Sequence, residues 1–100
     1  FAYVFYCTGN HELWVKRPDA KVDGDREFKD SVDKFHHLLQ VAREAGAMVD
    51  PTRLGSGADA LWVIPLQSWY ESEFGNPGDA IKQQAQKVVT DFRECVWPEA

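Results

Sequence analysis

The chain begins with an apolar, β-prone run, residues 1–8, in which apolar side chains do not alternate with polar ones. A strand with one face in water alternates, whereas a strand covered on both faces reads as a continuous apolar run. The run therefore predicts a central, buried strand, with the thiol of Cys7 buried as inert packing. Because a chain terminus is ordinarily polar, we also expect residues 1–100 to be an internal piece of one domain, incomplete at both ends.

The remaining segments alternate between helical and extended patterns. Apolar side chains at steps of four and three predict an amphipathic helix whose start is capped by Asp25 or Asp30 and whose end lies at Gly46. Its expected buried face consists of Phe28, Val32, Phe35, Leu39 and Ala42. Residues 48–54 predict an edge strand interrupted by a proline, and residues 60–64 predict a second buried strand. With a second helix expected over residues 79–93, the order predicts an α/β fold.

Composition excludes several functional classes. The chain has 11 Lys and Arg against 16 Asp and Glu, a net charge of −5, which argues against binding nucleic acid because a phosphate backbone attracts clustered cations. No apolar run approaches the ~18 residues of a membrane span, so no membrane association is expected. Cys7 and Cys95 lack the spacing of a metal or redox motif. We expect two reduced thiols and an intracellular location, in the cytoplasm or a plastid.

The segment Gly9-Asn10-His11-Glu12 directly follows the predicted buried strand. Ligands of layered α/β folds bind at the carboxyl ends of strands, where loops open into a crevice. Gly9 permits a positive φ and a close approach of the backbone to a ligand. Asn10 offers a neutral oxygen ligand, and His11 offers an imidazole that titrates near neutrality. These residues predict a ligand-binding loop; the alternative is a polar turn that ends a strand.

The same segment, preceded by Thr8, resembles the Gly-Asn-His-Asp/Glu block of the calcineurin-like metallophosphoesterases. Residues 64–70 and 91–98 resemble segments that follow this block in a plant and algal branch of that superfamily. The resemblance implies a layered α/β/β/α sandwich and hydrolysis of a phosphate ester at a centre of two divalent ions (Mn, Fe or Zn). It implies that Asn10 ligates one ion, and that His11 contacts the phosphate or protonates the leaving group. Gly9 and Glu12 complete the motif, with no catalytic role for Glu12.

Four further residues are candidates for the lining of a substrate cleft: Lys16, Arg17, Trp69 and Tyr70. The cations follow the motif and could face an anionic ester, and the aromatic residues lie in a loop after a strand. Solvated surface charge and core packing are the alternative explanations. The Asp-x-His and Gly-Asp-x-x-Asp blocks of the superfamily are missing. The chain alone is therefore expected to be inactive, with the remaining metal ligands outside it.

Two other interpretations stay open at this point. The first is a catalytically degenerate phosphoesterase fold that serves as a binding or interaction module. The second is an unrelated α/β domain in which the motif is accidental. Neither the oligomeric state nor the choice between a phosphate monoester and a diester follows from the sequence.

Overall fold

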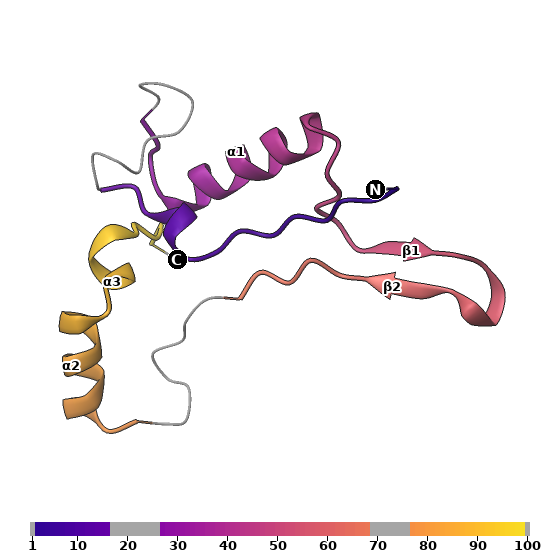
Figure 1. Cartoon of the computed structure of the whole chain (residues 1–100). Coiled ribbons are helices and arrows are strands. Elements are labelled where there is room, and N and C mark those ends of the chain that lie inside the picture. Colours follow the sequence, from indigo (N-terminus) through magenta and orange to yellow (C-terminus); the bar gives the residue numbers. More distant parts are fainter. Residues whose placement is uncertain (1, 17–26, 69–76, 100) are drawn as a thin grey trace.

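A computed structural model describes residues 2–16, 27–68 and 77–99 (Figure 1). The fold is mixed α/β, with helices and one two-stranded antiparallel sheet. The elements in chain order are the 3-10 helix η1 (His11–Leu13), α1 (Ser31–Glu44), β1 (Thr52–Leu54), the 3-10 turn η3 (Gly57–Asp59), β2 (Leu61–Val63), α2 (Asp79–Val88) and α3 (Asp91–Glu94).

Helix α1 confirms the strongest of the sequence predictions. It begins at Ser31, after Asp30, whose carboxylate accepts a hydrogen bond of 2.8 Å from the backbone N–H of Asp33. The second predicted cap, Asp25, lies outside the described residues. The helix ends before Gly46, which takes a φ of 87°, a conformation that glycine adopts without strain.

The buried face of α1 differs from the predicted one. Its buried side chains are Ser31, Lys34, His37 and Leu39, whereas Val32, Phe35 and Ala42 are only half-buried. The helix packs on the backbone of η1, whose carbonyl groups require hydrogen-bond donors. Polar side chains of α1 supply those donors, so the buried stripe is rotated away from the most apolar one.

The prediction of a central strand at residues 1–8 is wrong. The segment makes one parallel bridge, Phe5 with Met48, through hydrogen bonds from the Tyr6 N–H to the Met48 carbonyl (3.0 Å) and from the Met48 N–H to the Val4 carbonyl (2.8 Å). Val4 is 55% exposed, and Cys7 is exposed instead of buried. A strand is covered on both faces only when neighbouring strands and helices surround it. Within the described residues this segment has one bridge and, at its end, a hydrogen bond of 3.1 Å from the Thr8 hydroxyl to Oε1 of Gln67.

The two predicted later strands form the hairpin β1–β2, with Thr52 paired to Val63 and Leu54 paired to Leu61. The turn between them uses Gly55 and Gly57, whose φ angles of 79° and 63° favour glycine. Strand β2 was expected to be buried, but Trp62 is 61% exposed. A two-stranded sheet hides a face only against a further layer, and none of the described residues provides that layer.

The predicted helix over residues 79–93 is two helices. Helix α2 stops at Val88 because Val89 is extended, with a ψ of 117°, and α3 resumes at Asp91. The β-branched run from Val88 to Thr90 explains the break, because such side chains lose χ1 freedom in a helix. No residue of α2 is fully buried.

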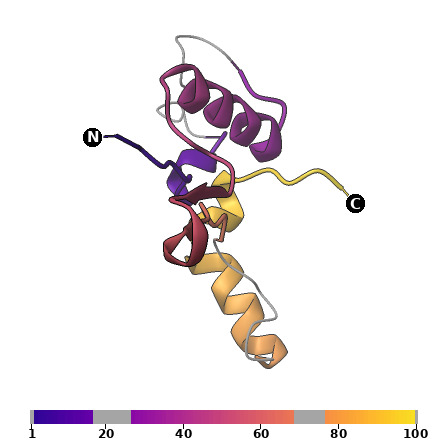
Figure 2. The same ribbon diagram turned by 90° about the vertical axis from the view of Figure 1, so that its right-hand side faces the viewer.

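The core is small and lies where η1, α1 and the segment after α3 meet. It consists of Leu13, Trp14 and Cys95, with Phe35 packed against it. The radius of gyration is 17.0 Å, above the roughly 13 Å of a compact chain of this length. Figure 2 shows α1 and α2 at opposite ends of the molecule. Among the described residues no helix has the length and apolar character needed to cross a membrane.

Candidate functional site

The motif residues form the start of η1, at the edge of the small core. Asn10 occupies the N-cap position, and its carbonyl accepts a hydrogen bond of 3.1 Å from the Leu13 N–H. Gly9 is not among the glycines with a positive φ, contrary to prediction. A Cβ at this position would lie 2.6 Å from Oε2 of Glu12, so a larger residue would only displace the end of that exposed side chain. The Glu12 side chain therefore folds back over Gly9.

The side chain of Asn10 is held by a carboxylate from the far end of the chain. Its Nδ2 donates to both carboxylate oxygens of Asp91, each at 3.0 Å. An asparagine at an N-cap ordinarily uses Oδ1 to accept from the helix N–H groups, but no such cap bond forms here. Among the described residues nothing donates to Oδ1 of Asn10, so this oxygen is available to a ligand.

His11 is exposed and stacks on Trp14, with the ring centroids 4.0 Å apart and the planes tilted by 31°. The Trp14 indole in turn donates a hydrogen bond of 2.6 Å to Oδ1 of Asp91. One buried carboxylate thus supports both motif residues, Asn10 directly and His11 through the indole beneath it. His11 as a whole is exposed, so a substrate can approach it.

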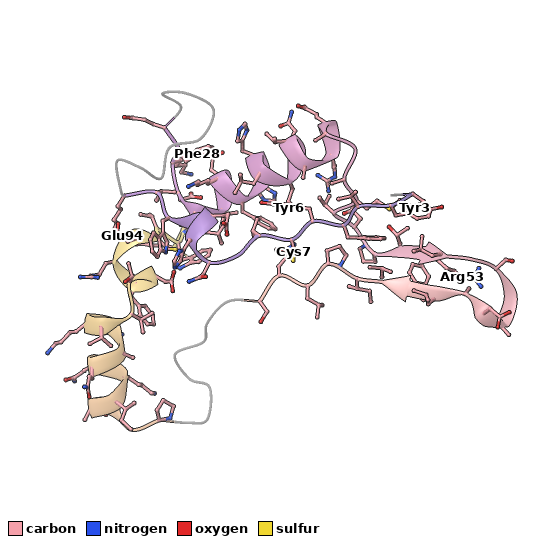
Figure 3. The ribbon with its side chains drawn as sticks, in the orientation of Figure 1. Tyr3, Tyr6, Cys7, Phe28, Arg53 and Glu94 are labelled. Carbon is pink, nitrogen blue, oxygen red and sulfur yellow. The ribbon has the colours of Figure 1, made fainter. Side chains whose placement is uncertain are left out.

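Beneath the loop, α1 holds η1 in place with two buried side chains. The Ser31 hydroxyl, fully buried, donates to the Leu13 carbonyl at 2.8 Å and accepts from the Val96 N–H at 2.9 Å. The Lys34 ammonium donates to the Trp14 carbonyl at 2.6 Å. On the other side the Val15 N–H donates to the Glu94 carbonyl at 2.9 Å, and Figure 3 labels Glu94 at this junction.

Burial and the charge of Glu12 set the electrostatics around the loop. Burial lowers the pKa of Lys34, and the Glu12 carboxylate partly offsets this effect. Burial raises the pKa of Tyr6, and the charge of Glu12 raises it further. Burial also raises the pKa of Cys95, although a hydrogen bond with Ser31 acts in the opposite direction. Glu12 is itself exposed, and its charge acts on both Tyr6 and Lys34.

The structure brings Gly9, Asn10, His11 and Glu12 together, and it leaves the predicted cleft largely undescribed. The Lys16 N–H donates to the Glu94 carbonyl at 3.2 Å, and its side chain is exposed. Arg17, Trp69 and Tyr70 lie outside the described residues.

Sequence reasoning missed the residues that support the loop: Asp91, Trp14, Ser31 and Lys34. In the sequence, nothing distinguishes three of them from the other polar residues of a helix: Asp91, Ser31 and Lys34. Trp14 gave one signal, as an aromatic side chain three positions after His11 at the end of the motif. The helical spacing would have placed its ring beside the imidazole.

One atom of the loop fits a metal centre. Oδ1 of Asn10 fits as one neutral oxygen ligand, since its amide is fixed and the oxygen is uncommitted. In the described ranges, however, no three side chains of His, Cys, Asp or Glu come together as a metal site. These residues accordingly provide one ligand rather than a whole centre. In comparisons with known proteins, no family model, no curated protein and no solved structure matches the chain.

Proposed function

We propose that this chain supplies the Gly9–Glu12 block of a calcineurin-like metallophosphoesterase, a layered α/β/β/α enzyme that hydrolyses a phosphate ester. In this proposal the chain is an internal part of one such domain, and the other metal ligands come from sequence outside residues 1–100. The isolated chain is inactive for that reason. We place the enzyme in the cytoplasm or a plastid, where thiols such as those of Cys7 and Cys95 stay reduced.

The observation that carries the proposal is the state of the Asn10 side chain. Its amide nitrogen is bound to Asp91, while its oxygen accepts nothing from the described residues. A carboxamide oxygen is a hard ligand suited to divalent cations such as Mn²⁺. When bound, the two divalent ions of such a centre (Mn, Fe or Zn) neutralise the phosphoryl oxygens and activate a water for attack.

His11 supplies the second function of the block. The exposed residue lies against Trp14 and directly follows Asn10 in the sequence, and in this proposal it contacts the phosphoryl group at the ion that Asn10 ligates. An alkoxide leaving group requires a proton, and an imidazolium at this position donates it. Lys16, Arg17, Trp69 and Tyr70 are proposed as residues of the surrounding substrate cleft.

The test separates the two motif residues in the natural protein that contains this chain. Asn10→Ala removes a ligand oxygen and is expected to lower both metal content and kcat. His11→Ala is expected to keep the metal and to lower kcat for alkyl phosphates by roughly 10²–10⁴-fold. For nitrophenyl phosphate, whose leaving group departs without a proton, the loss is expected to be smaller.

Controls for this test come from the exposed surface. Asp59 is exposed in the turn η3, which lies between β1 and β2 and far from the motif (Figure 1). The variant Asp59→Asn is expected to match the wild type in metal content and kcat. If both motif variants have wild-type metal content and activity, the proposed function is refuted. Equal losses for alkyl and nitrophenyl phosphates in His11→Ala would instead refute the proton-donor role.

A degenerate binding module is the second candidate, and the hairpin favours it. Leu61, Trp62, Ile64 and Leu66 expose more than half of their surface. Contiguous exposed apolar side chains are typical of protein interaction sites. If the natural protein is such a binding module, it has no phosphatase activity at any metal concentration. The same kinetic assay therefore decides between the two functions.

A further inference from the structure

Among the described residues, Asp91 is the buried carboxylate that contacts the motif. It is 7% exposed, and it lies 81 residues after Asn10 in the sequence. A buried carboxylate is costly unless donors surround it. Here three donor contacts do so, two from Nδ2 of Asn10 at 3.0 Å and one from the Trp14 indole at 2.6 Å. Both Asp91 oxygens are therefore engaged by the two residues that flank η1.

A carboxamide can present either end to a neighbour, because rotation by 180° exchanges its oxygen and nitrogen. A carboxylate accepts hydrogen bonds and donates none. If the Asn10 amide were rotated, its oxygen would face the oxygens of Asp91 and the pair would repel. Asp91 thus permits only the orientation in which Nδ2 faces inward and Oδ1 faces away.

We infer that Asp91 is a positioning residue, which fixes the Asn10 amide so that its oxygen is presented to a divalent cation. This inference rests on the proposed function, and it assigns Asp91 a role that acts through Asn10 and not on the substrate. The carboxylate also polarises the amide, which makes Oδ1 a stronger ligand. The Trp14 indole gives Asp91 a further donor, which offsets part of the cost of burying its charge.

The first arm of the test measures the amide orientation directly. The chain has two asparagines, Asn10 and Asn76, so ¹⁵N-asparagine labelling gives two side-chain signals, and Asn10→Asp identifies one of them. In the wild type the Nδ2 protons of Asn10 are expected to exchange slowly with water. Asp91→Asn removes the charged acceptor and is expected to speed this exchange by about tenfold.

The second arm measures Mn²⁺ affinity by equilibrium dialysis in the natural protein that contains the chain. Asp91→Asn is expected to weaken Mn²⁺ binding by roughly 10–100-fold. Trp14→Phe removes the indole donor but keeps both bonds between Asn10 and Asp91. It is expected to leave the Asn10 signal slow to exchange and the Mn²⁺ affinity near that of the wild type. Asp59→Asn serves as the exposed control for a lost carboxylate.

Three results overturn the inference. The first is slow exchange of the Asn10 signal in Asp91→Asn. The second is an equal loss of Mn²⁺ affinity in Asp91→Asn and Trp14→Phe, which shows a merely structural role. The third is unchanged affinity in Asp91→Asn while Asn10→Ala weakens binding, which leaves the proposed function intact. If Asn10→Ala itself has no effect on Mn²⁺ affinity, the proposed function fails together with the inference.

Discussion

The substitution Ser31→Ala tests the support beneath the candidate site. Ser31 is fully buried at the first position of α1, and its hydroxyl joins the Leu13 carbonyl to the Val96 N–H at 2.8 and 2.9 Å. Alanine keeps the helix and the packing volume nearly unchanged. The perturbation therefore removes the bonds of the hydroxyl to both backbone groups and its hydrogen bond with the Cys95 thiol.

The two groups differ in their access to water, and this difference sets the expected magnitude. Leu13 is 1% exposed, so its carbonyl loses its partner in a dry site, a loss of about 1–3 kcal/mol. Val96 is half-buried, so water can reach its N–H and the loss lies near 1 kcal/mol. We expect Ser31→Ala to lower the free energy of unfolding by about 2–4 kcal/mol, a large part of the ~5–15 kcal/mol of a typical domain.

The measurement is equilibrium unfolding in urea, followed by circular dichroism and tryptophan fluorescence in parallel. The change is expected in the midpoint with an unchanged m-value, because the surface exposed on unfolding stays the same. Ser56→Ala is the matched control, since Ser56 is exposed and its side chain makes no cap bond to η3. A loss below about 0.5 kcal/mol in Ser31→Ala would refute the reasoning, because buried partners cannot be removed at so small a cost.

Three further predictions concern metal, thiols and pH. Calorimetry of the 100-residue chain with Mn²⁺ or Zn²⁺ is expected to show no tight binding of two equivalents. The reason is that, among the described residues, no three His, Cys, Asp or Glu side chains come together as a metal site. Tight binding would contradict the proposal that the other metal ligands lie outside residues 1–100. Thiol titration under denaturing, non-reducing conditions is expected to find both Cys7 and Cys95 free, and an intramolecular disulfide would contradict this. Burial raises the pKa of the Cys95 thiol above its ordinary value of 9.0. Above pH 9 the folded state therefore keeps a proton that the unfolded state loses. The stability that this thiol contributes is complete below pH 9 and declines as the pH rises further. The stability difference between wild type and Cys95→Ala is accordingly expected to shrink above pH 9 by up to ~1.4 kcal/mol per pH unit, and parallel pH profiles would refute this.

Local sequence determined the elements whose stability depends on near neighbours. Helix α1 follows from apolar spacing, the Asp30 cap and the Gly46 stop, all of which act within a few residues. The hairpin follows from two β-prone segments around Gly55 and Gly57. The break at Val89 also had a local cause, in the β-branched side chains around it, although the apolar period of residues 79–93 concealed it.

Tertiary structure alone decided which surfaces are buried. The apolar runs at residues 1–8 and 60–64 were expected to be covered, but exposure depends on layers that their own sequence does not specify. On α1, Ser31 and Lys34 are buried in place of more apolar neighbours because they donate hydrogen bonds to the carbonyl groups of Leu13 and Trp14. A pattern of hydrophobicity predicts that a face will be buried, whereas the chemistry of the partner decides which face it is.

The candidate site shows the same division. Gly9–Glu12 were identified as a block because they are consecutive, and the turn that they form is local. The residue that orders them, Asp91, is 81 positions away, and Ser31 reaches Leu13 over 18 positions and Val96 over 65. Hydrogen bonds of this reach leave no periodicity in the sequence, because each depends only on where folding brings a donor and an acceptor within about 3 Å.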